Sequence, residues 1–233
     1  MSAPLQIGRN KAASPDFLFY RPFAVSLQQT SRIFAGETRN GMSRIKRVCV
    51  YCASSTDVDK KYFADTAMLG TLLARNGIET VCGAGNEGLM RQLADSVLEA
   101  NGTVIGVIPQ FMADKGWGHA GLTQVVVTPD IHARKRQMAT LADAVVALPG
   151  GCGTMEELLE IITWKQLGLF DGMIVVLNTD GYYAPLLAML EKAIDAKFMK
   201  ASHRNLWHTA ATPQEAVNLI LNNPEESYIE PKR

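Results

Sequence analysis

From residue 44 onward, short apolar runs alternate along the chain with longer segments in which apolar residues recur at helical spacing. The short runs are typical of strands buried on both faces, so the alternation predicts an α/β fold: a doubly wound, mostly parallel sheet with helices on both faces. The predicted strands are 47–53, 78–82, 104–108, 124–128, 144–148 and 173–177. The predicted helices are 58–76, 87–100, 131–142, 154–168, 183–197 and 213–222.

Residues 1–42 do not follow this pattern. They mix proline, glycine, serine and scattered arginine without a sustained period. We therefore expect a disordered N-terminal extension followed by a single domain over 43–233. Two alternatives stay open for the first stretch, because its arginines and few acidic residues resemble an organelle transit peptide and Met42 is an alternative start.

The charge balance narrows the expected partners. Lysine plus arginine and aspartate plus glutamate both number 23, so no net charge attracts nucleic acid or an acidic membrane surface. The longest apolar stretches are strand-sized and fall short of the roughly 20 residues that span a bilayer. We therefore expect neither a nucleic-acid partner nor a membrane partner.

The four cysteines lie in apolar or glycine-rich contexts and are too few for the disulfide framework of a small secreted protein. This usage favours a reducing, cytoplasmic location. Cys49 and Cys52 form a C-x-x-C motif inside a predicted strand, where residues three apart point to opposite faces. We therefore expect no metal site and no redox role there.

In doubly wound sheets, ligands bind at the carboxyl ends of the strands. There the sequence places Gly83, Gly85 and Gly88, which spell G-x-G-x-x-G between a predicted strand and a predicted helix. This motif is typical of a dinucleotide-binding loop. Two features count against a dinucleotide site: the motif follows the second strand, and the next strand ends without an acidic residue that would bind a ribose hydroxyl. Phosphate or nucleotide contact and a tightly packed glycine turn stay equal alternatives.

A second glycine-rich loop, P-G-G-C-G-T at 149–154, precedes the helix predicted from Thr154. Glycines let backbone N–H groups approach an anion closely, and a helix N-terminus adds positive charge. The loop lacks the G-K-[ST] ending of a Walker A loop. We therefore expect a phosphate cradle that uses no lysine.

Acidic residues follow this loop directly. Thr154 and Glu157 have the T-x-x-E spacing of a capping box, and the spacing alone favours that structural role. Glu156 and Glu160 then continue a polar face, opposite a buried face made of Met155, Leu158, Leu159 and Ile162. The alternative is chemical: a carboxylate beside a bound phosphate faces an electron-poor part of the same ligand, such as a ribose anomeric carbon losing its base.

A basic segment with Arg134, Lys135 and Arg136 opens the helix predicted over 131–142. One or two of these cations would enter the cleft, and a solvated helix face is the equal alternative. His132 beside them is more typical of a helix terminus or a packing position than of a catalytic base.

Several motifs together resemble the Lonely Guy (LOG) family of cytokinin-activating phosphoribohydrolases, long mislabelled as lysine decarboxylases. "PGGCGTMEE" (149–157) is similar to the family signature P-G-G-x-G-T-x-x-E, and "IHARK" (131–135) is similar to the family's basic motif. Further segments that resemble the family in order are "GAGNEGLM", "VIGVIP", "ITWKQLG" and "NTDGYY". The likeness spans about residues 45–224.

The resemblance implies a Rossmann-like homodimer, without an organic cofactor, that hydrolyses the N-glycosidic bond of adenosine 5′-monophosphates or their N6-substituted forms. The products are the free base and ribose 5-phosphate. By motif position, Glu157 is the catalytic carboxylate and Arg134 its essential partner. The substrate-binding residues expected on the same basis are Ser55, Gly83, Gly85, Lys135, Gly150, Gly151, Cys152, Gly153, Thr154, Met155, Glu156 and Thr163.

The sequence also departs from the family. Ala84 interrupts the family's triple glycine after the second strand, and Asn86 and Arg91 replace commoner small residues. Gly116 stands where many members carry an acidic residue. The loop around Gly116 is expected to shape the base pocket, so the choice between a cytokinin base and adenine stays open.

Other classes of protein fit less well. Molybdenum-cofactor carriers share the glycine loops, so a non-catalytic nucleotide or cofactor carrier is the main alternative, although a carrier needs neither Arg134 nor Glu157. A DNA-binding protein of similar fold would show a basic stripe with interleaved aromatic residues. A pyridoxal-phosphate decarboxylase needs a lysine for a Schiff base and an acid for the ring nitrogen, and no loop presents that set.

Overall fold

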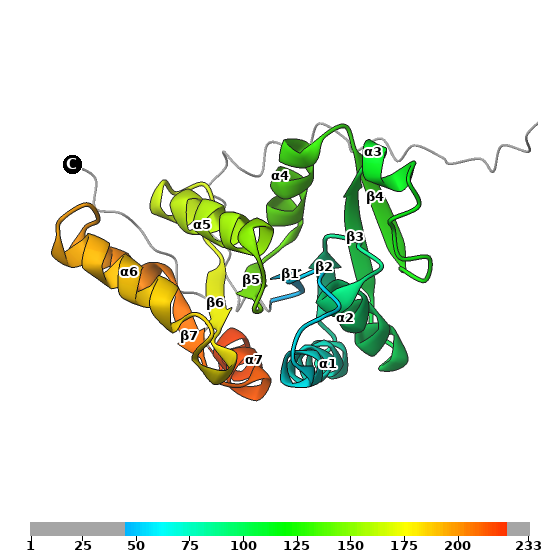
Figure 1. Cartoon of the computed structure of the whole chain (residues 1–233), viewed down its shortest axis with the longest axis horizontal. Helices are drawn as coiled ribbons and strands as arrows, with labels where there is room; N and C mark the ends of the chain where they lie inside the picture. Colours follow the sequence, from blue (N-terminus) through cyan, green and yellow to red (C-terminus); the bar gives the residue numbers. More distant parts are fainter. Residues whose placement is uncertain (1–44, 223–233) are drawn as a thin grey trace, which may run out of the picture. The chain divides into compact units, whose positions relative to one another are not determined.

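The computed structural model describes residues 45–222 of the 233-residue chain, so the extension expected over 1–42 lies outside the described residues. Seven strands form one parallel sheet (Figure 1). They are β1 (Arg47–Tyr51), β2 (Glu79–Cys82), β3 (Val104–Pro109), β4 (Gln124–Thr128), β5 (Ala144–Ala147), β6 (Met173–Leu177) and β7 (His208–Ala210). Their order, β4-β3-β2-β1-β5-β6-β7, confirms the predicted doubly wound architecture.

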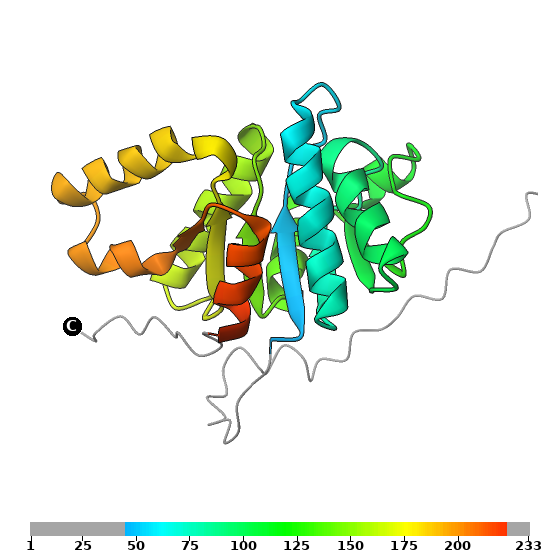
Figure 2. The same cartoon turned by 90° about the horizontal axis from the view of Figure 1, so that it is seen from below.

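Helices cover both faces of this sheet (Figures 1 and 2). One face is packed by α1 (Lys60–Arg75), α2 (Gly88–Glu99) and α7 (Pro213–Asn222). The other face is packed by α4 (Ile131–Leu141), α5 (Cys152–Gln166) and α6 (Ala184–Asp195). The short helical turns in the described part of the chain are α3 (Gln110–Ala113), η2 (Thr179–Gly181) and η3 (Ala201–Leu206).

The side chains of β1 alternate between two hydrophobic cores. Val48 and Val50 pack with α1, α2 and α7, whereas Cys49 and Tyr51 pack with α4 and α5. Cys52 belongs to the first core and Cys49 to the second. The two thiols of the C-x-x-C motif therefore lie on opposite faces of the sheet, as their spacing in a strand predicts.

Two strands differ from the sequence prediction. Val125 and Val127 of β4 are each 38% exposed, so the expectation of burial on both faces is wrong there, because β4 forms an edge of the sheet. β7 pairs with β6 at the other edge. Its three residues, two of them polar, form no apolar run, and the sequence pattern misses it. None of the helices within residues 45–222 is both long and apolar enough to cross a membrane.

Candidate active site

The strand order reverses between β1 and β5, and ligands of doubly wound sheets bind in the crevice beside such a reversal. Tyr51 at the end of β1 is in register with Ala147 at the end of β5. The Leu148 N–H donates to the Tyr51 carbonyl at 2.9 Å. The loop after β1 and the glycine-rich loop before α5 therefore leave the sheet side by side.

The glycine-rich loop is packed on its inner side and open on its outer side. Gly150 and Thr154 are buried, whereas Gly151, Cys152 and Gly153 are exposed. A β-carbon on Gly150 would lie 2.2 Å from Thr154 Oγ1, while one on Gly151 or Gly153 would meet no atom within 4 Å. The first N–H groups of a helix have no partner within the helix, so this open end of α5 can hold an anion.

The predicted capping box is wrong. α5 begins at Cys152, two residues earlier than expected, and its N-cap is Gly151 with extended backbone angles (φ −80°, ψ −160°). Thr154 therefore lies inside the first turn, and the Glu157 carboxylate accepts a hydrogen bond from Arg134 instead of serving as a cap. The expected buried face is also partly wrong, because Leu159 is 38% exposed while Glu157 is buried.

Arg134 extends from the first turn of α4 into the crevice. Its Nε donates to the Val107 carbonyl on β3 at 3.1 Å, and its Nη1 donates to Glu157 Oε1 at 3.2 Å. Only 12% of the Arg134 side chain and 10% of the Glu157 side chain are exposed. The structure therefore joins the two residues expected to be catalytic in a buried ion pair.

Burial raises the pKa of the Glu157 carboxyl above its ordinary value of 4.5, and the charge of Arg134 offsets only part of this effect. A carboxyl with a raised pKa exchanges its proton closer to neutral pH, which suits a general base. The Cα of Glu157 lies about 9 Å along the helix axis from Gly151, and helical side chains tilt toward the N-terminus. This spacing fits a ligand that carries an anionic group and a reactive carbon several ångströms apart.

Lys135 turns inward beside this pair. Its Nζ donates to Glu156 and, at 3.3 Å, to Glu160, and only 7% of its side chain is exposed. Burial alone would lower the pKa of Lys135, but the hydrogen bonds and charges of the two glutamates outweigh it and raise the pKa. His132 and Arg136 are exposed, so the basic segment is partly a site element and partly a solvated face.

The glycines after β2 make room for neighbouring groups. A β-carbon on Gly83 would lie 2.1 Å from Arg134 Nη2, and one on Gly85 would lie 2.7 Å from the tip of Met90. Gly88 has a positive φ of 59°, and a β-carbon there would lie 2.4 Å from the Ser55 carbonyl oxygen. Gly83 therefore leaves room for the guanidinium, and Gly88 lets the exposed loop of Ser55 pack against the start of α2.

The departure at Ala84 is accommodated within the fold. Ala84 has a positive φ of 61° and is 1% exposed. A β-carbon on Gly106 of β3 would lie 2.7 Å from the Ala84 methyl, so the glycine in the neighbouring strand provides the space for it. Gly116 has a φ of 70° with open space around it, a conformation that glycine adopts without strain.

An open groove of about 680 Å³ runs along the outward face of α5 from the glycine-rich loop. Its lining residues are Cys152, Met155, Glu156, Leu159, Glu160, Thr163 and Trp164. The Thr163 hydroxyl donates to the Leu159 carbonyl within the helix at 2.8 Å. Four of the expected substrate-binding residues thus share one surface.

Sequence reasoning missed two tyrosines that hold the glycine-rich loop. The Tyr182 hydroxyl donates to the Gly150 carbonyl at 2.6 Å, and the Tyr183 hydroxyl donates to the Leu148 carbonyl at 2.7 Å. Both follow η2, which connects β6 to α6. The segment "NTDGYY" contributes to the family resemblance, but a contact across about 30 residues of chain leaves no local signal in the sequence.

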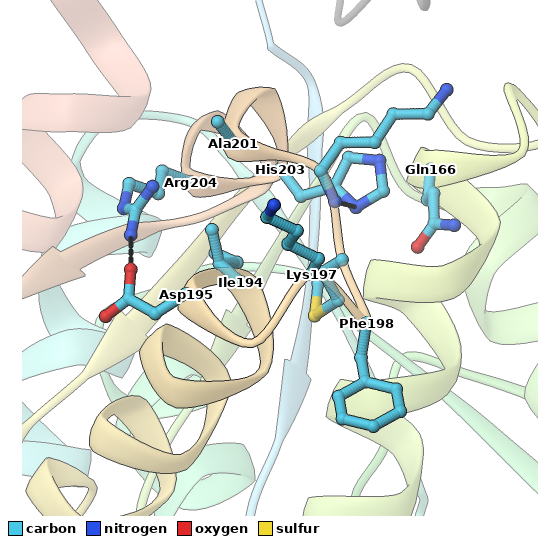
Figure 3. Close-up of a pocket in the computed structure, with 10 residues that line it drawn as sticks. Gln166, Ile194, Asp195, Lys197, Phe198, Ala201, His203 and Arg204 are labelled. Atoms are coloured by element: carbon cyan, nitrogen blue, oxygen red, sulfur yellow. Dashed lines mark hydrogen bonds and ion pairs between the residues drawn. The ribbon is translucent and has the colours of Figure 1, made fainter.

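A second hollow, of about 750 Å³, lies where the end of α5 meets the end of α6 and η3 (Figure 3). Lys197, Lys200 and Arg204 bring positive charge to it. Arg204 is paired with Glu191 at 2.8 Å and with Asp195 at 2.7 Å. Gln166, the last residue of α5, lines this hollow, so the length of the helix separates it from the glycine-rich loop.

The described residues contain no group of three or more histidine, cysteine, aspartate or glutamate side chains placed to hold a metal ion. The cysteines Cys49, Cys52 and Cys82 are buried free thiols, and burial raises the pKa of each.

Solved structures of known proteins share this fold. A protein solved by X-ray methods in a structural genomics programme superposes with a TM-score of 0.61 at 28% identity, over 75% of this chain and 98% of that one. The molybdenum cofactor carrier protein of Chlamydomonas reinhardtii superposes with a TM-score of 0.58 at 23% identity, over 76% and 96%. At that identity the second likeness shows the fold alone.

Sequence comparisons identify the family. A family described as "possible lysine decarboxylase" matches residues 90–220. A probable cytokinin riboside 5′-monophosphate phosphoribohydrolase of Oryza sativa subsp. japonica is 44% identical over 74% of this chain and 77% of its own length. A cytokinin riboside 5′-monophosphate phosphoribohydrolase of Arabidopsis thaliana is 42% identical over 76% and 78%. The chain therefore belongs to the LOG family of cytokinin riboside 5′-monophosphate phosphoribohydrolases.

Proposed function

We propose that the protein hydrolyses the N-glycosidic bond of adenosine 5′-monophosphates, including N6-substituted forms, and releases the free base and ribose 5-phosphate. The observation that carries the proposal is the buried Arg134–Glu157 pair, which lies on α4 and α5 beside the open N-terminus of α5. The relatives named for this activity, at 42–44% identity, support it.

In this reaction the phosphate binds at Gly150, Gly151, Gly153 and Thr154, where backbone N–H groups and the helix dipole favour an anion. The anomeric carbon then faces Glu157. As the bond from that carbon to the base breaks, the ribose gains oxocarbenium character, which a carboxylate stabilises. The water oxygen attaches to the anomeric carbon, and the base leaves with a proton.

Arg134 has two parts in this account. Its charge opposes the effect of burial on the Glu157 carboxyl, so the ionised form is more populated than burial alone would allow. Its hydrogen bonds to Val107 and Glu157 also fix where the carboxylate lies. Gly83 leaves the space that the guanidinium needs.

The groove on α5 is our proposed site for the base. Met155, Leu159 and Trp164 give it an apolar part, while Glu156 and Thr163 give it hydrogen-bonding groups. An apolar part of the wall favours a base with a hydrocarbon substituent at N6. AMP remains a substrate in this account, with fewer apolar contacts. Lys135, Cys152, Ser55 and Gly85 complete the proposed binding surface.

We further propose a cytoplasmic homodimer in which residues 43–233 form the single catalytic domain. The turn after α5 carries Leu167 and Leu169, which are 62% and 60% exposed. Exposed apolar side chains gathered on one surface are typical of a subunit interface. Light scattering should give twice the chain mass of 25.4 kDa. The buried free thiols fit a reducing compartment.

Neither alternative accounts for the ion pair. A carrier of nucleotide or molybdenum cofactor needs the glycine loops but has no use for a buried carboxylate with a raised pKa. A pyridoxal-phosphate decarboxylase needs an unprotonated lysine, and Glu156 and Glu160 raise the pKa of Lys135. The buried Glu157 carboxylate and the raised pKa of Lys135 therefore both favour hydrolysis over these alternatives.

The direct test is identification of products. The purified protein is incubated separately with AMP and with N6-isopentenyladenosine 5′-monophosphate, and the base, nucleoside and ribose 5-phosphate are quantified by mass spectrometry. We expect base and ribose 5-phosphate in equal amounts, with the faster rate for the substituted nucleotide. Tight nucleotide binding without release would support the carrier alternative. Nucleoside plus inorganic phosphate would indicate a phosphatase.

A further inference from the structure

The segment after β6 is fastened to its surroundings in several places. The Asn178 side chain accepts a hydrogen bond from the Tyr183 N–H at 2.6 Å, and the Thr179 hydroxyl donates to Asp65 on α1 at 2.5 Å. The ring of Tyr182 makes edge contacts with the rings of Tyr62 and Tyr183, with centroids 5.9 and 5.1 Å apart. The Tyr182 ring is therefore held independently of its hydroxyl.

That hydroxyl donates to one particular peptide of the glycine-rich loop. It bonds the Gly150 carbonyl at 2.6 Å, and the same planar peptide unit carries the N–H of Gly151. In a trans peptide the carbonyl and the N–H point in opposite directions. When the carbonyl is held toward Tyr182, the Gly151 N–H is aimed away from it. Gly151 is exposed, with open space beside its Cα.

The neighbouring tyrosine makes a matching bond with a different consequence. Tyr183 donates to the Leu148 carbonyl at 2.7 Å, and the next residue is Pro149, which has no N–H. Fixing this peptide orients no donor. Tyr183 is also 1% exposed, whereas Tyr182 is 39% exposed. Tyr183 therefore serves packing and the start of the loop.

We propose that Tyr182 is a positioning residue for the anion site: its hydroxyl holds the Gly150–Gly151 peptide so that the Gly151 N–H faces the substrate phosphate. The inference rests on the proposed function, because it takes the phosphate to bind at this loop. It assigns to a residue 32 positions away a role in recognition of the phosphate end of the substrate.

The test compares Tyr182→Phe with Tyr183→Phe, since each removes one tyrosine hydroxyl bonded to the same loop. KM and kcat are measured with AMP or N6-isopentenyladenosine 5′-monophosphate, whichever the wild type cleaves. Inhibition constants are measured for the two products, ribose 5-phosphate and the free base. Melting temperature is measured for both variants. The ribose 5-phosphate constant reports the anion site, and the free-base constant reports the rest of the pocket.

For Tyr182→Phe we expect KM and the inhibition constant of ribose 5-phosphate to rise together by about three- to tenfold, which is the change in affinity expected when one hydrogen bond is lost. The kcat and the free-base constant should stay within twofold. Tyr183→Phe should lower the melting temperature more and shift the ribose 5-phosphate constant less. Equal changes for both products, or unchanged constants in a Tyr182→Phe protein that still turns over, would overturn the proposal. A wild type that releases no base would instead overturn the proposed function.

Discussion

Gly83→Ala tests whether the position of the Arg134 guanidinium matters for activity, because it moves the group without removing its charge. A β-carbon at residue 83 would lie 2.1 Å from Arg134 Nη2 and 3.2 Å from its Cζ. Gly83 is not among the glycines with a positive φ, so alanine strains no backbone angle. The substitution leaves both residues of the ion pair in the chain and changes only where the guanidinium can lie.

The size of the effect follows from the distances. To restore a normal contact near 3.5 Å, the guanidinium must retreat by roughly 1.4 Å. Its hydrogen bond to Glu157 is already 3.2 Å long, so a shift of that size breaks it. A misplacement of about 1 Å in a catalytic group costs about 100-fold in rate, or about 2.7 kcal/mol in activation free energy. Adding a methyl group to a packed site typically costs about 1–3 kcal/mol. Because the clash is with the flexible end of a side chain, we expect the free energy of unfolding to fall by about 1 kcal/mol, the lower end of that range.

The assay is steady-state release of the base, with melting temperature measured on the same samples. Gly70→Ala is the matched control, because it adds the same methyl group on α1, away from the crevice, where the nearest atom is the Leu93 carbonyl oxygen at 3.0 Å. We expect kcat to fall about 100-fold in Gly83→Ala and to stay within twofold in Gly70→Ala. Activity within twofold of wild type in Gly83→Ala would refute the argument that this glycine seats the guanidinium.

Two further predictions concern stability and pH. Gly106→Ala places a β-carbon 2.3 Å from Leu122 Cδ1 and 2.7 Å from the Ala84 methyl, so urea unfolding should show a loss of about 1–3 kcal/mol; an unchanged midpoint would contradict this packing argument. The raised pKa of Glu157 means that its carboxyl is protonated at pH values where an exposed glutamate is still ionised. The acid limb of kcat/KM should therefore lie above pH 4.5, and a limb at or below that value would show that burial does not control the group.

The parts of the fold that the sequence predicts are those with a periodic signal. Every predicted helix and strand is found within two residues of its expected bounds, because short continuous apolar runs mark the strands and apolar residues at a period of 3.6 mark the packed faces of the helices. Because ligands bind at the carboxyl ends of the strands in such sheets, the sequence alone predicts that Arg134 and Glu157 lie at the same crevice. β7 carries no such signal and was missed.

The parts that sequence reasoning could not supply depend on tertiary contacts. The T-x-x-E spacing favours a capping box at Thr154, but Gly151 adopts the extended N-cap conformation, so α5 begins two residues earlier than the spacing predicts. That shift turns Glu157 from a cap partner into a buried ion-pair partner. The sequence pattern also places Leu159 on the buried face, although it is exposed, because the packing of α5 on the sheet decides which apolar residues face outward. The bond from Tyr182 to Gly150 joins two loops that are far apart in the chain.

The measurement that tests the central claim most directly is base release by Glu157→Gln beside Glu191→Gln. Each variant removes one carboxylate that pairs with an arginine, but Glu157 pairs with Arg134 in the crevice, while Glu191 on α6 pairs with Arg204 outside it. Glutamine keeps the side-chain shape and a hydrogen-bond acceptor for the arginine, so both proteins should stay folded. We predict a loss of about 100- to 10,000-fold in kcat for Glu157→Gln and less than threefold for Glu191→Gln. A folded Glu157→Gln protein that releases base at the wild-type rate would contradict the account.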